Sequence, residues 1–342
     1  MPLLLVSALL LGDPTNWAEY RHDHALSCVG PMDGATESKD LIIAGKAYRL
    51  NGSRLVALDK TPPAQVRIGV LSSIKDFGPE TKTNLDKFFK WFAAEGVDWV
   101  VLNGDISGSE DEFDELLAYL TAFGKPLLLT IGNYESRGSY FRAVTAAADA
   151  SPLVVDMNLV RTVEAAGVTM VSMPGYYDHR FLHSGSGCIY KPDDVDDTIE
   201  GLDAVAPASA SAPRLLISHG PPKGTGTKTI DVAAEGRVNV GDPSLTKLIR
   251  SGDFSFGLFG HILESGGRSV AGDLATPVRE DVWSPQLYVN AGASSSSPWG
   301  LNDGSTSVGM AALMTVSGSK AKVKFKMFKE GHGGAPTAST IE

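Results

Sequence analysis

Val100-Val101-Leu102-Asn103-Gly104-Asp105 is an apolar segment that runs directly into a Gly-Asp turn. Three later segments have the same form: an apolar strand stops, and a residue able to bind a metal follows at once. They end in Asn133, His219 and His261. Side chains at the carboxyl ends of strands in an open sheet converge on one crevice. We therefore expect Asp105, Asn133, His219 and His261 to lie together.

These four side chains offer one carboxylate, one amide oxygen and two imidazoles. Such a mixed set of ligands suits a borderline divalent metal such as zinc, manganese or iron. The sequence therefore predicts a metal site at Asp105, Asn133, His219 and His261.

The segments around these strand ends alternate between strand and helix patterns, which indicates an α/β fold. Apolar residues recur at helical spacing over about 80–95, and again after Ser109, which is suited to cap a helix. A further strand at 127–131 and a helix near 140–148 follow, and this alternation implies parallel crossover connections. Later strands are mostly joined without clear helices and predict a second sheet against the first. They lie near 168–173, 214–218, 256–260, 286–290, 309–316 and 321–328.

The ends of the chain have different compositions from the central part. Residues 1–12 contain an apolar run that resembles an export signal, although no Lys or Arg precedes it; a short buried strand or helix is the alternative. The run is too short to span a bilayer as a helix. We expect an N-terminal extension with short strands at 13–64, a main domain at 65–330 and a flexible tail at 331–342. The predicted location is exported or periplasmic, with cytoplasmic as the alternative.

Five short motifs in the main domain carry a resemblance to the calcineurin-like metallophosphoesterases. That family has D-x-H, G-D-x-x-D, G-N-H-E, a lone His and G-H-x-H, in this order, at strand ends. The corresponding places here are Ser73-Ile74-Lys75, Gly104-Asp105-Ile106-Ser107-Gly108, Gly132-Asn133-Tyr134-Glu135, His219 and Gly260-His261-Ile262-Leu263. The resemblance covers roughly residues 66 to 328. It implies an α/β two-sheet sandwich flanked by helices, the metallophosphoesterase-like four-layer fold.

The resemblance also implies a pair of metals, of which this sequence keeps the ligands for one. Family members clamp phosphate between two metals about 3.5 Å apart. The ligands of one metal correspond to Asp105, Asn133, His219 and His261, and all four are present. Of the places that bind the other metal, only Asp105 still holds a suitable ligand. The remaining places hold Ser73, Lys75 and Leu263, so we expect one divalent metal and no second one.

Two further substitutions affect the expected chemistry. The family histidine that acts on the leaving group is replaced by Tyr134, and the second Asp of G-D-x-x-D is replaced by Gly108. The ammonium group of Lys75 is a candidate to lie beside Asp105 and hold a phosphate oxygen; the alternative is that it points to solvent. Tyr134 and Lys75 are therefore the candidate catalytic residues.

Three functional hypotheses follow. In the first, the protein is a catalytically impaired member of the family that binds a phosphate-bearing ligand or a protein partner. In the second, it hydrolyses phosphoesters with one metal plus Lys75. In the third, it is a structural or assembly component with a vestigial cleft. The net charge of −10 argues against a nucleic-acid-binding surface. Cys28 and Cys188 are far apart in the sequence, which leaves open whether they pair.

Overall fold

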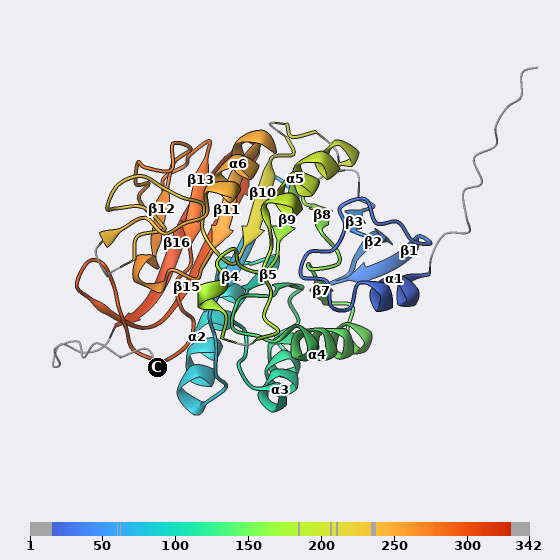
Figure 1. The fold of residues 1–342 in the computed structure, drawn as a ribbon, viewed down its shortest axis with the longest axis horizontal. Helices are drawn as coiled ribbons and strands as arrows, with labels where there is room; N and C mark the ends of the chain where they lie inside the picture. The colour runs from blue at the N-terminus through green and yellow to red at the C-terminus, as the bar shows by residue number, and fades with distance from the viewer. Residues whose placement is uncertain are drawn as a thin grey trace, which may run out of the picture.

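The computed structural model describes residues 16–329, except residues 60, 62, 184, 206, 210 and 234–236. Figure 1 shows two β-sheets with helices packed on either side of them. The predicted export signal at 1–12 and the predicted tail at 331–342 lie outside the described residues. In the part of the chain that the structure describes, no helix has the length and apolar composition needed to cross a membrane.

The helices begin and end at residues with the expected local chemistry. Helix α2 starts with Pro79 in its first turn and ends at Gly96, whose positive φ of 68° closes the last turn. The Ser109 side chain accepts a hydrogen bond from the Glu112 backbone N–H and caps α3, as predicted. The α-helices described are α1 (Trp17–Asp23), α2 (Pro79–Glu95), α3 (Glu110–Thr121), α4 (Arg137–Ala150), α5 (Pro192–Gly201) and α6 (Pro243–Ser251).

The first sheet is built around the predicted strand–helix alternation. Its strands β4, β5, β6 and β7 are parallel neighbours, which confirms the predicted crossover connections. The strand order is β14-β15-β4-β5-β6-β7, and β16 pairs with β15. The strands are β4 (Val66–Leu71), β5 (Trp99–Asn103), β6 (Leu127–Thr130), β7 (Val154–Asp156), β14 (Trp299–Gly300), β15 (Thr306–Ser317) and β16 (Lys320–Lys329).

The second sheet has nine strands in the order β1-β2-β3-β8-β9-β10-β11-β13-β12. Its centre is parallel, because β9, β10, β11 and β13 pair in the same direction. The strands are β1 (Lys39–Ile43), β2 (Lys46–Asn51), β3 (Arg54–Ala57), β8 (Thr162–Ala165), β9 (Val168–Met173), β10 (Arg214–Ser218), β11 (Phe254–Phe259), β12 (Arg268–Val270) and β13 (Leu287–Asn290).

Two details of the predicted second sheet are wrong. The strands near 309–316 and 321–328 return to the first sheet, where β15 pairs antiparallel with both β4 and β16. Strands β10 and β11 are joined through α6, which the sequence analysis did not identify. Their pairing is parallel and therefore needs a long crossover connection, which this helix provides.

The central strands β5 and β6 of the first sheet are buried on both faces, and successive side chains enter different cores. In β5, Trp99 and Val101 belong to the core between the two sheets, whereas Val100 and Leu102 pack in the core that contains residues of α2, α3 and α4. A third core lies between the second sheet and the helices α5 and α6. The fold is therefore α/β with four layers, which confirms the predicted two-sheet sandwich flanked by helices. The continuous apolar run of β5 results from burial on both sides.

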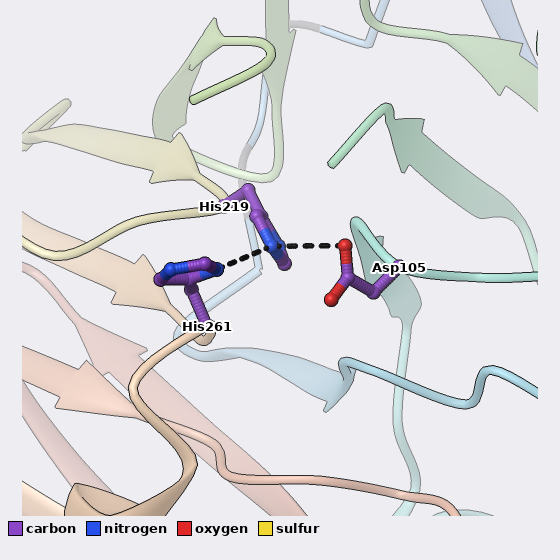
Figure 2. A group of neighbouring side chains, drawn as sticks. All are labelled: Asp105, His219 and His261. Carbon is purple, nitrogen blue, oxygen red and sulfur yellow. Dashed lines mark hydrogen bonds and ion pairs between the residues drawn. The ribbon is translucent and has the colours of Figure 1, made fainter. Parts of the chain in front are cut away.

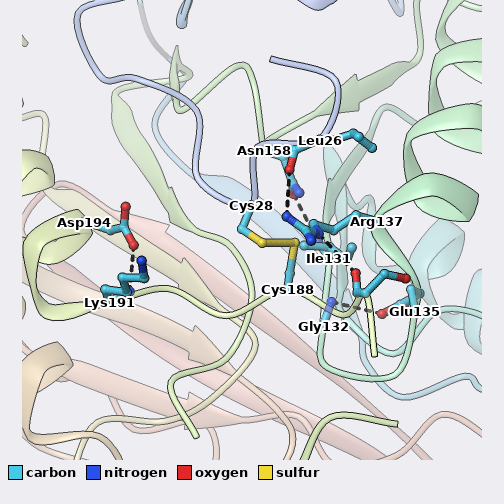
Figure 3. Close-up of a disulfide and its surroundings, with 11 residues drawn as sticks. Leu26, Cys28, Ile131, Gly132, Glu135, Arg137, Asn158, Cys188, Lys191 and Asp194 are labelled. Carbon is cyan, nitrogen blue, oxygen red and sulfur yellow. Dashed lines mark hydrogen bonds between the residues drawn. A yellow bond between two sulfur atoms is a disulfide. The ribbon is translucent and has the colours of Figure 1, made fainter. Parts of the chain in front are cut away.

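A disulfide joins Cys28 to Cys188, so the two cysteines whose pairing the sequence left open are paired. Figure 3 shows it next to Arg137, which donates a backbone hydrogen bond to the carbonyl of Ser186 and a side-chain one to the carbonyl of Leu26. The carbonyl of Cys188 also accepts a hydrogen bond from the backbone of Tyr176. The bond therefore attaches the segment after α1 to the loop that follows β9.

Candidate metal centre

The four predicted metal ligands all lie just beyond strand ends and come together. Asp105 follows β5, Asn133 follows β6, His219 follows β10, and His261 follows β11. Two ligands thus come from each sheet. The ligand atoms of Asp105, His219 and His261 lie within 4.8 Å of one another, in a cluster that Figure 2 shows from close by.

The cluster is centred on the Nε2 atom of His219. This atom lies 2.8 Å from Asn133 Oδ1, 3.1 Å from Asp105 Oδ1 and 3.2 Å from His261 Nδ1. Asp105, Asn133 and His219 are almost completely buried. Four atoms capable of ligating a metal therefore face one another inside the protein.

Neighbouring hydrogen bonds fix how these groups are oriented. His219 Nδ1 lies 2.9 Å from the carbonyl oxygen of Asn103, which can only accept, so Nδ1 carries the proton of the neutral ring. The Asn133 amide nitrogen donates to the carbonyl of Phe181 at 2.5 Å, which turns its oxygen toward His219. The lone pairs of His219 Nε2, Asn133 Oδ1 and Asp105 Oδ1 therefore point at one another.

This arrangement fits a divalent cation. Buried lone pairs that face one another repel unless a positive charge lies between them. The donor set of two imidazoles, one carboxylate and one amide oxygen suits a borderline metal. The hydrogen bond from His219 Nδ1 to a backbone carbonyl is the outer contact that metal-binding histidines usually make. Asp105, Asn133, His219 and His261 are the residues that would hold the ion.

The pKa values of these groups follow the same pattern. Burial opposes the charged forms of Asp105 and His219, but their mutual attraction outweighs it, so the pKa of Asp105 is held well below its usual range and the pKa of His219 is raised. Burial and the neighbouring His219 lower the pKa of His261 well below its usual range. His261 is therefore neutral near pH 7 and able to ligate, while the centre of the cluster favours a positive charge.

Lys75 lies on the other side of Asp105. Its ammonium nitrogen is 3.5 Å from Asp105 Oδ2, and its side chain is 28% exposed. The same ammonium group lies 5.3 Å from the centre of the Tyr134 ring, within reach of a cation–π interaction. The backbone N–H of Tyr134 also donates to Asp105 Oδ1 at 3.1 Å. Both predicted catalytic residues thus contact Asp105, and the ammonium group of Lys75 faces that carboxylate.

The segment after β4 keeps an unusual backbone. Ser73 has a φ of 50° and Lys75 a φ of 63°, close to the values of 53° at Asp105 and 60° at His261. Residues other than glycine rarely adopt this left-handed conformation, and such residues cluster at functional sites. The Ser73 hydroxyl is buried and makes no hydrogen bond within the described residues. The backbone around Ser73 and Lys75 is therefore shaped like that of the ligand-bearing turns.

The ring of Tyr134 fills the space that a side chain at residue 108 would need. A Cβ atom added at Gly108 would lie 2.1 Å from Cε1 of Tyr134, a distance that no real pair of carbons adopts. The tyrosine ring therefore fits only because residue 108 has no side chain. Leu263, in the 3-10 turn Leu263–Ser265, is apolar and 5% exposed, so it offers no ligand.

Several residues that the sequence analysis did not assign to the site also support it. Glu135 accepts hydrogen bonds from the backbone N–H groups of Ile106 and Gly132, which brace the two ligand-bearing turns. Burial, reinforced by Asp105, raises the pKa of Glu135 to about 7. Asn103 donates to the carbonyls of Ser218 and Leu258 and so joins the two sheets behind the site. A polar residue at the end of an otherwise apolar strand was the available signal for Asn103.

The loop after β9 packs aromatic side chains against the site. The ring of Tyr176 lies 3.8 Å from that of His261, measured between ring centres, and Phe181 lies 5.8 Å from it. The ring of His183 packs against Tyr134 at 4.9 Å. Arg180, in contrast, is 74% exposed and pairs with Asp178. Tyr176 and Phe181 therefore pack against the ligand His261, His183 packs against Tyr134, and the arginine of the loop takes no part.

Comparisons with known proteins agree with this architecture. A sequence model described as calcineurin-like phosphoesterase matches residues 67–265. No curated protein matches the sequence. One crystal structure has a TM-score of 0.54 and 15% identity, covering 77% of this chain and 99% of its own, which supports the fold.

Two phosphatase structures are also similar, with TM-scores below 0.5. A dimetal phosphatase from Danio rerio has a TM-score of 0.48 and 13% identity, covering 79% of this chain and 99% of its own. A purple acid phosphatase from yellow lupin has a TM-score of 0.47 and 11% identity, covering 82% of this chain and 56% of its own.

The family assignment rests on the sequence model, which spans more than half of the chain. The match includes the turns that carry Asp105, Asn133, His219 and His261. Members of this family typically bind divalent metals, and the described residues provide a possible site. The chain belongs to the calcineurin-like phosphoesterases.

Proposed function

We propose that this protein binds one divalent metal on Asp105, Asn133, His219 and His261. In the same cleft it binds a phosphate-bearing ligand or a protein partner, with little of the two-metal turnover of its family. The observation that supports this most directly is the ion pair of Lys75 with Asp105 Oδ2, at 3.5 Å. Oδ1 of the same carboxylate contacts His219. One oxygen therefore faces the metal ligands, and the other faces a fixed protein cation.

The proposal of a single metal also rests on the residues that stand in place of the second metal's ligands. Ser73 and Leu263 stand where the resemblance places ligands of that metal, and neither offers a strong ligand. An ammonium group 3.5 Å from Asp105 Oδ2 also repels a nearby divalent ion, because the separation of the two charges is short and the carboxylate is buried.

The remaining residues of the cleft suit binding more than bond cleavage. Lys75 provides a positive charge that can hold a phosphate oxygen, but an ammonium group is not a Lewis acid. A zinc, manganese or iron ion would supply polarisation of a phosphoryl oxygen. Tyr134 offers a hydroxyl group in place of a histidine, and a phenol is a weak proton donor at neutral pH. Phosphate recognition is therefore better provided for than departure of a leaving group.

A second candidate function is hydrolysis by one metal plus Lys75. The contact between the Lys75 ammonium and the Tyr134 ring, at 5.3 Å, favours it, because it places a cation next to the hydroxyl-bearing side chain. In this case the phenol would donate to the leaving group. The same experiment separates the two functions.

The decisive experiment measures metal content and phosphoesterase activity on one protein preparation. We expect about one divalent ion per chain and little turnover of aryl phosphates or bis-aryl phosphates with added manganese or zinc. His219→Ala is the matched control, because it removes the central ligand. Two tightly bound ions per chain, or rapid turnover abolished by His219→Ala, would contradict the first function. Slow turnover lost in Lys75→Met would favour the second.

We also propose that the protein is exported. The Cys28–Cys188 disulfide supports this, because disulfides persist mainly in oxidising compartments. Fractionation of the cells that produce the protein, followed by thiol labelling, tests it. Reduced cysteines in a cytoplasmic fraction would contradict export.

A further inference from the structure

A basic hollow of about 740 Å³ lies at the β12 end of the nine-stranded sheet. Its walls include residues of β12, a residue of β16, and loop residues at 227–228, 237, 277–280 and 302–303. Figure 1 shows β12 and β16 on the same side of the molecule, drawn in orange and red. Lys75 and the four candidate metal ligands are not part of its lining, so the hollow is separate from the metal centre. Four cationic side chains line it: Lys228, Arg237, Arg268 and Arg279.

The carboxylates near these cations balance their charge only in part. None of the four takes part in an ion pair within the described residues. The hollow also contains the carboxylates of Glu280 and Asp303. Four cations and two carboxylates leave an excess of two positive charges, in a protein whose net charge is −10.

The two carboxylates accept hydrogen bonds from other groups. Glu280 accepts one from the backbone N–H of Phe325 at 2.8 Å. Asp303 accepts two from Ser305, from the backbone N–H at 2.9 Å and from the hydroxyl at 2.7 Å. These bonds hold Glu280 against β16 and Asp303 in its own loop, and neither carboxylate forms an ion pair with the four cations in the described part of the chain.

The guanidinium of Arg268 is held in place before any ligand arrives. Its Nη1 group donates to the carbonyls of Thr227 and Thr229, each at 3.2 Å. Its Nε and Nη2 groups make no hydrogen bond within the described part of the chain. A half-buried arginine that is fixed on one side and free on the other loses little entropy when it binds an anion.

We propose that this hollow binds a small polyanion with at least two phosphate groups. Guanidinium groups bind phosphate oxygens in pairs, and three of them together with one lysine exceed what a single carboxylate needs. The volume lies within the range of pockets that hold small molecules. Attraction to the ligand also relieves the repulsion among the four cations, which Glu280 and Asp303 balance only in part.

Phosphate oxygens are found both in free polyphosphates and, one phosphate at a time, on the surface of a membrane that contains anionic lipids. We assign the hollow to a free polyphosphate, because the cations line a concave space and do not project from a flat face. Inorganic pyrophosphate is the probe for this source, and vesicles that contain phosphatidylserine are the probe for the other.

The test is calorimetric titration of the full chain with pyrophosphate. Lys228→Gln combined with Arg279→Gln removes two exposed charges and should weaken binding by about tenfold or more. Arg268→Gln should have a similar effect, and a native melting temperature shows whether it folds. The matched control is Arg49→Gln with Arg142→Gln, since both arginines are exposed and pair with Asp40 and Asp114 elsewhere. The control should leave the affinity unchanged.

Three outcomes would overturn the proposal. The first is equal pyrophosphate affinity in the wild type and in the Lys228/Arg279 double variant. The second is loss of binding in Lys75→Met with no loss in that double variant, which would assign the anion to the metal cleft. The third is binding to phosphatidylserine vesicles without binding to pyrophosphate.

Discussion

The two oxygens of Asp105 face very different surroundings. On the Oδ1 side, His219 lies 3.1 Å away and Asn133 and His261 complete a set of ligands that is nearly closed to solvent. On the Oδ2 side, the ammonium of Lys75 lies 3.5 Å away in a more exposed place, with Ser73 buried nearby in sequence. The Oδ1 side presents lone pairs that need a cation, and the Oδ2 side already has one in the ammonium group of Lys75.

The backbone does not differ in this way. Ser73 and Lys75 have the same left-handed φ as Asp105 and His261. The turn after β4 therefore keeps the shape of a ligand-bearing turn while its side chains have changed. The two halves of the cleft are therefore separable. One set of ligands can be replaced while the backbone of its turn, and all the ligands of the other half, stay in place.

The largest expected effect is on the Oδ1 side. His219→Ala removes the atom on which the other three ligands converge, so metal affinity should fall by more than about 100-fold. Titration with zinc, followed by elemental analysis, measures it. Lys75→Met serves as the comparison and should keep the metal. Equal loss of metal in both variants would show that the two sides act as one unit.

The next effect comes from rebuilding the Oδ2 side. Ser73→Asp, Lys75→His, Leu263→His and Tyr134→His together restore the ligands and the histidine that the family has. Because the backbone already has the required turn, we expect the stoichiometry to rise from about one metal per chain toward two. Elemental analysis after dialysis measures this. A quadruple variant that folds and still binds one ion would show that more than side chains was lost.

A third prediction concerns the packing of Gly108 against Tyr134. Gly108→Ala places a methyl group against the ring and should lower the free energy of unfolding by about 1–3 kcal/mol. In a Tyr134→Ala background the same change should cost much less, because the ring is gone. Urea unfolding of the four proteins in this double-mutant cycle measures the coupling. Additive effects would mean that the two positions changed independently.

The smallest effect is expected for the charge on Lys75. Lys75→Met keeps much of the bulk of the side chain and should weaken the binding of inorganic phosphate to the metal-loaded protein by about tenfold. Calorimetry measures it, and Lys82→Met is a control, since that lysine contacts Phe77 and not Asp105. Unchanged phosphate affinity in a folded, metal-loaded Lys75→Met variant would assign Lys75 a purely structural role.

Much of this architecture could be predicted from the sequence. The apolar runs that end in Asp105, Asn133, His219 and His261 placed four residues from two sheets at one site, because strand ends in such a fold meet at one edge. The helical spacing of apolar residues also predicted the helices that connect the parallel strands of the first sheet. It could not assign β15 and β16 to a sheet, because an apolar strand pattern does not specify its partner. Asp242 followed by Pro243 was a missed signal for the start of α6.

The rest of the site depends on contacts that no sequence pattern contains. The Tyr134 ring leaves no room for a side chain at residue 108, and only the three-dimensional structure shows this, because the two residues are far apart in the chain. The hydrogen bonds by which Asn103 joins both sheets likewise require three-dimensional neighbours. The basic hollow gathers residues from several loops and strands, each of which looks like an ordinary surface cation in the sequence.

The disulfide places two of the four candidate metal ligands inside a covalent ring of the chain and leaves the other two outside it. Cys28 and Cys188 are separated by 160 residues and close a covalent ring that contains Asp105 and Asn133 but neither His219 nor His261. In the chain-entropy description, a ring of this size removes about 5 kcal/mol of freedom from the unfolded chain. An oxidised chain that unfolds thus keeps strands β4 to β7 within one loop, while β14 to β16 of the same sheet and the second pair of ligands lie on an open tail. Assembly of the centre then amounts to docking that tail onto a ring that is already closed.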